Sequence, residues 1–131
     1  MPSNPLPITE ILTIQANRYP NLFIDKVINH VPGKSSTCLK NFTYNEWFFP
    51  EHYDDDPNVP GFVLIECLVQ SFLVTFLTLE EHRGSRTNFV NVKNVAFRRK
   101  IVPGDSLIIN CELKSLKRGL ANGSAIGHVD G

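Results

Sequence analysis

The alternation of apolar and polar positions divides the first third of the chain into one helix and two strands. Residues 8–20 have a weak helical period that a proline ends. Residues 21–31 and 35–45 alternate with a period of two, and the Pro32-Gly33 pair between them is typical of a turn. The pattern therefore predicts a short leading helix followed by an antiparallel hairpin.

A long apolar segment follows the hairpin. It begins at Gly61 and contains no further glycine or proline until Gly84, which makes it too long for a strand. We expect one helix over about 61–80. Turn residues then separate three further strand candidates, at 88–102, 106–119 and 124–131.

The long helix is apolar on nearly every side, so other elements must cover nearly all of it. With about five strands available, the economical solution is a curved antiparallel sheet wrapped around one central helix. This α+β architecture is the hotdog fold. The length of 131 residues and the hydrophobic content of 42% suit one domain spanning residues 1–131.

Charge and cysteine content exclude several functions. Thirteen basic and thirteen acidic residues cancel, so no overall field attracts nucleic acid or an anionic membrane. Three widely spaced cysteines without a CxxC pair or a histidine-rich segment predict reduced thiols in a cytoplasmic protein and no metal site. The N-terminus lacks the pattern of a secretory signal.

The long helix is also the one membrane-span candidate. Residues 62–79 approach the minimum length for a span. This stretch contains Glu66 and four other polar residues, and a carboxylate in mid-span costs roughly 3 kcal/mol. We therefore interpret it as a buried helix and expect no membrane span.

Two side chains are candidates for acid–base chemistry. Glu66 lies in the second turn of the predicted helix among apolar neighbours, where burial disfavours the charged form and favours a general acid. His52 lies 14 residues upstream in a proline-restricted loop and is a suitable base. Alternatively, Glu66 is fixed by a buried hydrogen bond or an arginine, and His52 is an ordinary loop histidine.

Gly61 provides a third element. The first N–H groups of a helix lack partners within the helix and lie at its positive end, and glycine allows a carbonyl oxygen to approach them closely. The alternative is a glycine required only by backbone geometry. A base, an acid and a carbonyl polariser together suit chemistry at the carbons next to a thioester or ketone.

Four segments carry a family resemblance that extends from about residue 18 to residue 113. They are RYPNLFIDKV, LKNFTYNEWFFPEHY, PNVPGFVLIECLVQS and AFRRKIVPGDSL. In order and spacing the chain resembles the 3-hydroxyacyl-acyl-carrier-protein dehydratases of fatty acid synthesis, of the Z type (FabZ). The resemblance implies a lyase that removes water from a 3-hydroxyacyl thioester and leaves a trans-2-enoyl thioester.

The resemblance also implies roles for single residues. His52 would remove the C2 proton, Glu66 would protonate the departing C3 hydroxyl, and the Gly61 amide would hold the thioester carbonyl. Gln70 would either orient Glu66 or pack in a subunit interface. Glutamate rather than aspartate at position 66 is similar to the Z type, and the reaction requires no cofactor or metal.

Assembly and substrate binding are further implications of the resemblance. Such enzymes form homodimers whose sites take the histidine from one subunit and the acid from the other, and often hexamers as trimers of dimers. The acyl tail would lie in an apolar tunnel lined by Phe62, Leu64 and Phe97. Arg98, Arg99 and Lys100 would contact the phosphopantetheine arm or the carrier protein, although a solvated edge-strand charge run is an equal alternative.

The chain departs from the family pattern around His52. The usual Gly before the histidine and the Phe-Pro-Gly after it are replaced by Glu51 and by Tyr53, Asp54 and Asp55, and Asp56 stands where a basic or polar residue is common. Family members also continue past the final VDG, so either the chain is trimmed or its last strand is shortened.

Two other functions are compatible with the sequence. A hotdog thioesterase would use a helix carboxylate to activate water, and the acidic loop favours a non-catalytic acyl-binding or scaffold subunit. The pairing of His52 with Glu66 favours the dehydratase over both. The acyl chain length, the pathway and the choice between carrier protein and coenzyme A stay open.

Overall fold

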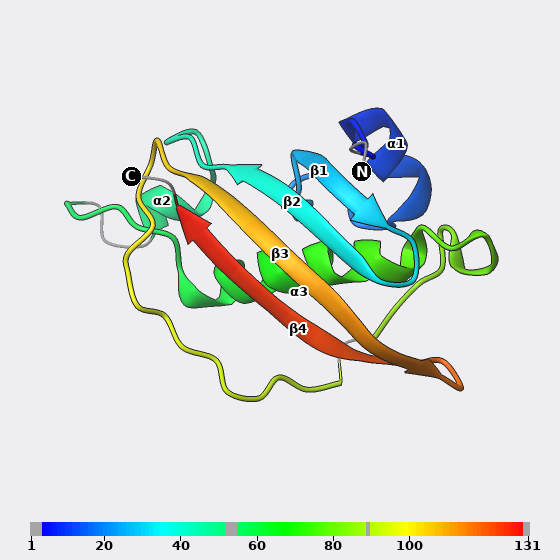
Figure 1. The fold of residues 1–131 in the computed structure, drawn as a ribbon. Helices are drawn as coiled ribbons and strands as arrows, with labels where there is room; N and C mark the ends of the chain where they lie inside the picture. The colour runs from blue at the N-terminus through cyan, green and yellow to red at the C-terminus, as the bar shows by residue number, and fades with distance from the viewer. Residues whose placement is uncertain (1–3, 52–54, 89, 130–131) are drawn as a thin grey trace.

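Four strands form one antiparallel sheet, in the order β1-β2-β3-β4, packed on the long helix α3 (Figure 1). The computed structural model describes residues 4–51, 55–88 and 90–129. This is the α+β hotdog arrangement that the apolar pattern predicts. The elements are α1 (Ile8–Ile14), β1 (Lys26–Val31), β2 (Ser35–Asn41), α2 (Phe48–Glu51), α3 (Gly61–Leu77), η1 (Glu80–His82), β3 (Ser106–Lys117) and β4 (Leu120–Val129).

The predicted β1–β2 hairpin is confirmed. The strands pair antiparallel from Lys26 opposite Leu39 to Val31 opposite Ser35. Gly33 has φ +78° in the turn, and its N–H donates to the backbone oxygen of Thr75 on α3 at 2.6 Å. The turn is therefore attached to the C-terminal part of the helix.

A two-residue turn joins β3 to β4. Arg118 and Gly119 both have positive φ, at 53° and 78°, which is the conformation of a type I′ hairpin turn. Because this turn returns the chain at once, β4 begins at Leu120 and not at the predicted residue 124. Gly123, expected in the loop, lies inside the strand opposite Leu113.

The predicted strand at 88–102 is wrong for the residues described there, 88 and 90–102. They form no ladder, and Figure 1 draws them as a coil outside the sheet. Val90 is 71% exposed and Asn94 has φ 56°, so the segment is neither covered by another layer nor continuously extended. Alternating β-branched residues are typical of a strand with one buried face. Within one copy of the chain, no other described element covers a face of residues 90–100.

The core follows α3 in two halves. Around its N-terminal half, Val63, Leu64 and Cys67 pack with buried phenylalanines and with Leu107 and Ile109 of β3. Around its C-terminal half lie Ile11 and Ile14 of α1 and the inner positions of β1 and β2. No helix in the described part of the chain has the length and apolarity needed to cross a membrane.

Helical backbone stops slightly before the predicted end at about residue 80. α3 ends at Leu77, and Leu79 is extended with φ −73° and ψ 138° before the short η1 turn. The other end of the helix begins at Gly61. The sheet and the core cluster around Val63, Leu64 and Cys67 fix that end against the segments described next.

Candidate active site

Glu66 projects from the second turn of α3 and is held by Gln70, one turn further along. The Gln70 side-chain amide donates to Glu66 Oε2 at 3.0 Å. Glu66 is half-buried, whereas Gln70 is 1% exposed. The two residues lie on the same face because positions four apart in a helix are neighbours. Glu66 is thus fixed by a hydrogen bond, and no arginine contacts it among the described residues.

Gln70 is itself fixed at both ends of its amide. Its nitrogen also donates to the backbone oxygen of Asn21 at 2.8 Å, and its oxygen accepts from the N–H of Phe23 at 2.7 Å. Both donor hydrogens and the carbonyl are therefore used, which determines the orientation of the amide. The carboxylate oxygen Oε2 of Glu66 must accept, and the segment before β1 is tied to the helix.

The N-terminus of α3 presents unpaired donors. Pro60 precedes the helix and offers no side-chain cap, and its backbone oxygen accepts from Val63 and Leu64 at 3.0 and 3.2 Å. Within the described residues, the N–H groups of Gly61 and Phe62 have no acceptor. A Cβ atom at Gly61 would lie 3.5 Å from the Phe97 ring, at ordinary van der Waals distance, so Phe97 adjoins this end of the helix. Such donors at a positive helix end can polarise a carbonyl oxygen.

Two contacts hold the loop before α3 against the 97–102 segment. The Val59 N–H donates to the Ile101 oxygen at 2.8 Å. The Lys100 ammonium meets the Asp56 carboxylate at 2.7 Å. Residues far apart in sequence are thereby brought to one place, beside Gly61.

Exposed aromatic rings surround the helix N-terminus. Phe62 is 61% exposed and Phe97 is 50% exposed, and the ring of Trp47 lies 6.3 Å from that of Phe62. Leu64, the third residue expected to line the acyl tunnel, is buried and packs in the core. Sequence reasoning missed Trp47, although it is the single tryptophan and lies directly before α2.

The basic run is partly neutralised by the chain itself. Besides the Lys100–Asp56 pair, Arg99 lies 3.8 Å from Asp105. In the part of the chain that the structure describes, Arg98 has no acidic partner. Two of the three basic side chains in the predicted positive patch, Arg99 and Lys100, are thus paired with acidic side chains of the same chain.

Sequence reasoning also missed a buried lysine, Lys40. Lys40 is 5% exposed, and its ammonium lies 3.0 Å from Glu46 and 3.5 Å from Asp25. The ion cluster links β2, the start of β1 and the loop that leads to α2. Its signal in the sequence is a lysine at an inward position of the β2 alternation, where Ser36 and Cys38 are also buried.

His52, the expected base, lies outside the described residues, as do Tyr53 and Asp54. The chain reaches His52 directly from α2, in which Phe48 and Phe49 are almost wholly buried. Among the described residues, no three His, Cys, Asp or Glu side chains group as metal ligands would.

The three cysteines are free and buried, in agreement with the predicted reduced thiols. Desolvation raises the pKa of Cys38 to about 11 and those of Cys67 and Cys111 to about 12, from an ordinary value of 9.0. Between the ordinary and raised values the folded state holds more protons than the unfolded state. The free energy of unfolding should therefore fall as the pH rises above 9.

We expect iodoacetamide at pH 8 to leave all three thiols of the folded protein unmodified, because only the thiolate reacts and burial keeps the thiols protonated. In denaturant all three should react. Mass spectrometry counts the labels. Labelling of any cysteine in the folded protein, on the timescale of labelling in denaturant, would contradict the burial described above.

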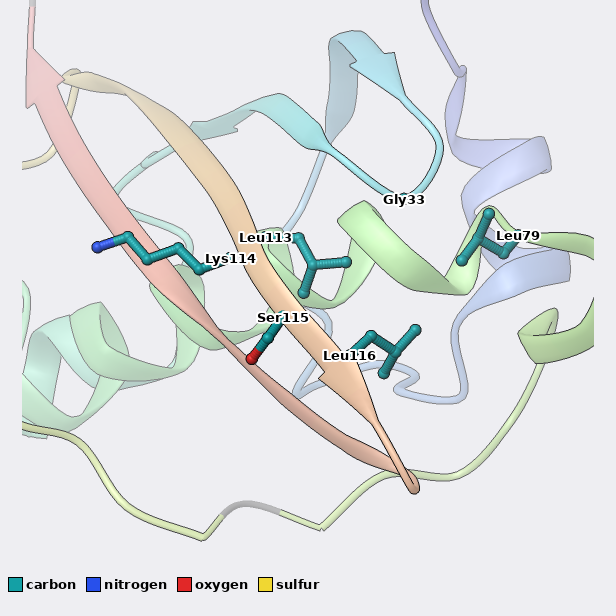
Figure 2. Close-up of a pocket in the computed structure, with 6 residues that line it drawn as sticks. All are labelled: Gly33, Leu79, Leu113, Lys114, Ser115 and Leu116. Atoms are coloured by element: carbon teal, nitrogen blue, oxygen red, sulfur yellow. The ribbon is translucent and has the colours of Figure 1, made fainter.

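One hollow lies away from Glu66. It has a volume of about 280 Å³ and is lined by Gly33, Leu79 and residues 113–116 of β3 (Figure 2). In Figure 2, Leu113 and Leu116 point into it, whereas Lys114 points away. It lies at the C-terminal end of α3 and holds no predicted site residue. The candidate chemistry is at the opposite end of the helix.

Known proteins resemble this chain over nearly its whole length. The FabA-like domain family matches residues 16–131. The 3-hydroxyacyl-[acyl-carrier-protein] dehydratase FabZ of Acetivibrio thermocellus is 38% identical over 122 residues, which cover 93% of this chain and 84% of that protein. The protein of the same name from Clostridium botulinum strain Okra is 40% identical over 126 residues, covering 96% and 88%. The chain belongs to the FabA-like family.

Proposed function

We propose that the chain is a dehydratase, a hydro-lyase that converts 3-hydroxyacyl thioesters to trans-2-enoyl thioesters in fatty acid or related biosynthesis. The observation that carries the proposal is the Glu66–Gln70 pair beside the open N-terminus of α3. The relatives named above supply the reaction and its carrier-bound substrate. Loss of enoyl absorbance when trans-2-butenoyl and trans-2-decenoyl carrier thioesters are hydrated tests it.

The hydrogen bond from Gln70 determines which oxygen of Glu66 can deliver a proton. Oε2 accepts from the amide, so in the acid form the proton is carried by Oε1. Among the described residues, none forms a hydrogen bond or an ion pair with Oε1. Glu66 can therefore donate from Oε1 to the C3 hydroxyl of a substrate while Gln70 keeps the carboxyl group in place.

His52 and Gly61 complete the elimination. His52 takes the proton from C2, the C2–C3 double bond forms, the C3–O bond breaks, and the proton from Glu66 converts the hydroxyl to water. The Gly61 N–H stabilises the negative charge that develops on the thioester oxygen. The roles of His52 and Gly61 rest on the family resemblance and on the uncapped helix end respectively.

The acyl chain and its carrier have separate candidate surfaces. Phe62 and Phe97 provide apolar contact next to Gly61, which suits the first carbons of an acyl chain. Arg98, Arg99 and Lys100 lie at the far end of the same segment and suit the phosphopantetheine arm, which acyl carrier protein and coenzyme A share.

Assembly into a homodimer would cover apolar side chains that one copy leaves open. Val90 and Phe97 are at least half exposed, and Ile126 of β4 is 70% exposed. β4 is also an edge strand, with no partner on its outer side among the described residues. Such edges pair readily with another chain. A homodimer would bring the histidine of one subunit to the acid of the other. Three such dimers would form a hexamer. The protein would act in the cytoplasm.

Mixing inactive subunits tests this sharing. We expect His52→Ala and Glu66→Gln homodimers to be inactive, while a refolded equimolar mixture recovers up to about a quarter of wild-type activity, because half the dimers are mixed and one site in each is intact. Enoyl absorbance is the readout. If the mixture stays as inactive as its components while mass spectrometry detects mixed dimers, the sites are not shared.

The two alternative functions lack a supporting observation. A thioesterase would release free thiol, and a scaffold subunit would bind acyl thioesters without converting them. The ordered Glu66–Gln70 pair would be unnecessary for a scaffold. Assaying free thiol and bound ligand beside enoyl absorbance separates all three.

A further inference from the structure

We infer that Asp56 is a built-in competitor for the phosphate of the substrate's phosphopantetheine arm, because it occupies the Lys100 ammonium that this phosphate would bind. The inference rests on the proposed function and adds a determinant of substrate affinity to it. Its basis is an ion pair that joins two features of the sequence, the acidic loop and the basic run.

The geometry of the pair is direct. Lys100 Nζ lies 2.7 Å from Asp56 Oδ2, at hydrogen-bond distance, and the side chains are 63% and 57% exposed. Both groups are therefore accessible to a ligand from solvent. The hydrogen bond between Val59 and Ile101 holds the two segments together independently of the ion pair, so breaking the pair need not release the loop.

The position of the pair relative to the reacting end suits a phosphate. The Phe97 ring adjoins Gly61, where the thioester carbonyl is expected, and Lys100 follows three residues later, within at most about 11 Å of backbone. A pantetheine arm that runs along this segment would carry its phosphate toward Lys100. Arg98, which no described acid contacts, would be the second cation for that phosphate.

The chemistry favours a phosphate over a protein surface. The basic run is three residues long, two of its members face intrachain acids, and the net charge of the chain is zero. A compact anion can replace one carboxylate at one ammonium, whereas a wide acidic surface would also meet Asp55 and Asp56 and be repelled. Arg99 is less available because Asp105 is held in its turn by the N–H of Val102 at 3.0 Å.

The competition should be modest and sensitive to salt. Exposed ion pairs are weak, so removing Asp56 should improve phosphate binding about 2- to 5-fold. At 1 M salt the Debye length is about 3 Å, and the difference should largely disappear. A larger effect or an effect independent of salt would indicate a structural role for the pair.

The experiment uses two esters that differ only in the phosphate, 3-hydroxybutyryl-pantetheine and 3-hydroxybutyryl-4′-phosphopantetheine. The ratio of their kcat/KM values is compared in wild type, Asp56→Asn and Asp56→Asn/Lys100→Ala, with Glu81→Gln as an exposed carboxylate control distant from the site. Taking a ratio within each variant cancels changes in folding. We expect Asp56→Asn to raise the ratio in favour of the phosphorylated ester and the added Lys100→Ala to abolish the gain.

An unchanged ratio in Asp56→Asn would overturn the inference. The inference would also be overturned if Asp56→Asn raised kcat/KM only for the 3-hydroxybutyryl carrier-protein thioester, because the effect would then belong to the carrier surface. Calorimetric binding of 4′-phosphopantetheine, which has no acyl group, keeps this test separate from the proposed function. If wild type converts neither these esters nor the carrier-protein thioester, but Asp56→Asn still binds 4′-phosphopantetheine more tightly than wild type, the dehydratase assignment fails and the inference stands.

Discussion

Glu66→Gln should lower kcat for water elimination by about 10²- to 10⁴-fold, the usual contribution of a general acid. Glutamine preserves the shape of the side chain, and its single carbonyl oxygen can still accept from Gln70, but it has no acidic proton to donate to the leaving hydroxyl. The folded structure should persist, since Glu66 is half-buried and its neighbours are unchanged. Steady-state kinetics of enoyl formation, with thermal unfolding in parallel, measures both effects.

Two further variants make this result specific. Glu81→Gln changes an exposed carboxylate beyond the other end of α3 and should leave kcat within about two-fold of wild type. Gln70→Leu removes the hydrogen bond to Glu66 and leaves the Phe23 N–H without its acceptor, so it should lower both kcat and stability. A Glu66→Gln enzyme that retains more than a tenth of wild-type kcat would exclude Glu66 as the acid.

Gly123→Ala should destabilise the fold by about 3 kcal/mol or more, a large effect for a single methyl group. A Cβ atom at this position of β4 would overlap the backbone oxygen of Glu112 and the ring of Phe72. The backbone oxygen belongs to the central strand β3 and cannot move aside without breaking its ladder. Urea unfolding of the variant beside wild type gives the difference in free energy.

Gly127→Ala is the matched control on the same strand. There the nearest atoms to an added Cβ are flexible side-chain carbons of Leu107 and Ile109, at 3.1 and 3.6 Å. The cost should be about 1 kcal/mol or less. Equal stabilities for the two variants would mean that β3 and β4 do not approach each other at Gly123 as described.

Strong periodicity predicted the parts of the fold that one copy can stabilise alone. The apolar run from Gly61 determined α3, and the position of Glu66 within it follows from counting turns. The β1–β2 hairpin followed from alternation and the Pro32-Gly33 turn. In each case a local pattern and the tertiary packing favour the same structure.

The errors have physical causes in particular residues. The predicted start of β4 in the β3–β4 hairpin was too late because Arg118 adopts positive φ. This conformation is uncommon outside glycine and gives no sequence signal. The alternation over 88–102 predicted a strand. Alternation shows that one face of a segment needs to be covered, but it does not show whether the same chain or a second subunit covers it. The contacts of Gln70 with Asn21 and Phe23 join segments about 50 residues apart, which no local pattern encodes.

The ion-pair partner of Asp56 also could not be predicted from the sequence. Its sequence neighbours suggested a uniformly acidic loop, whereas the structure pairs it with Lys100 across 44 residues. A departure from the family pattern at one position is thus matched by a partner elsewhere in the chain. At Asp56 the carboxylate is therefore not an uncompensated charge.

The most direct test of the central claim is the product formed from 3-hydroxybutyryl carrier-protein thioester by the wild-type protein. Enoyl thioester absorbance and free thiol are followed in the same reaction. The proposed site predicts reversible formation of the trans-2-enoyl thioester without thiol release. Thiol release without enoyl formation, or neither product from the folded protein with this and longer acyl chains, would contradict it.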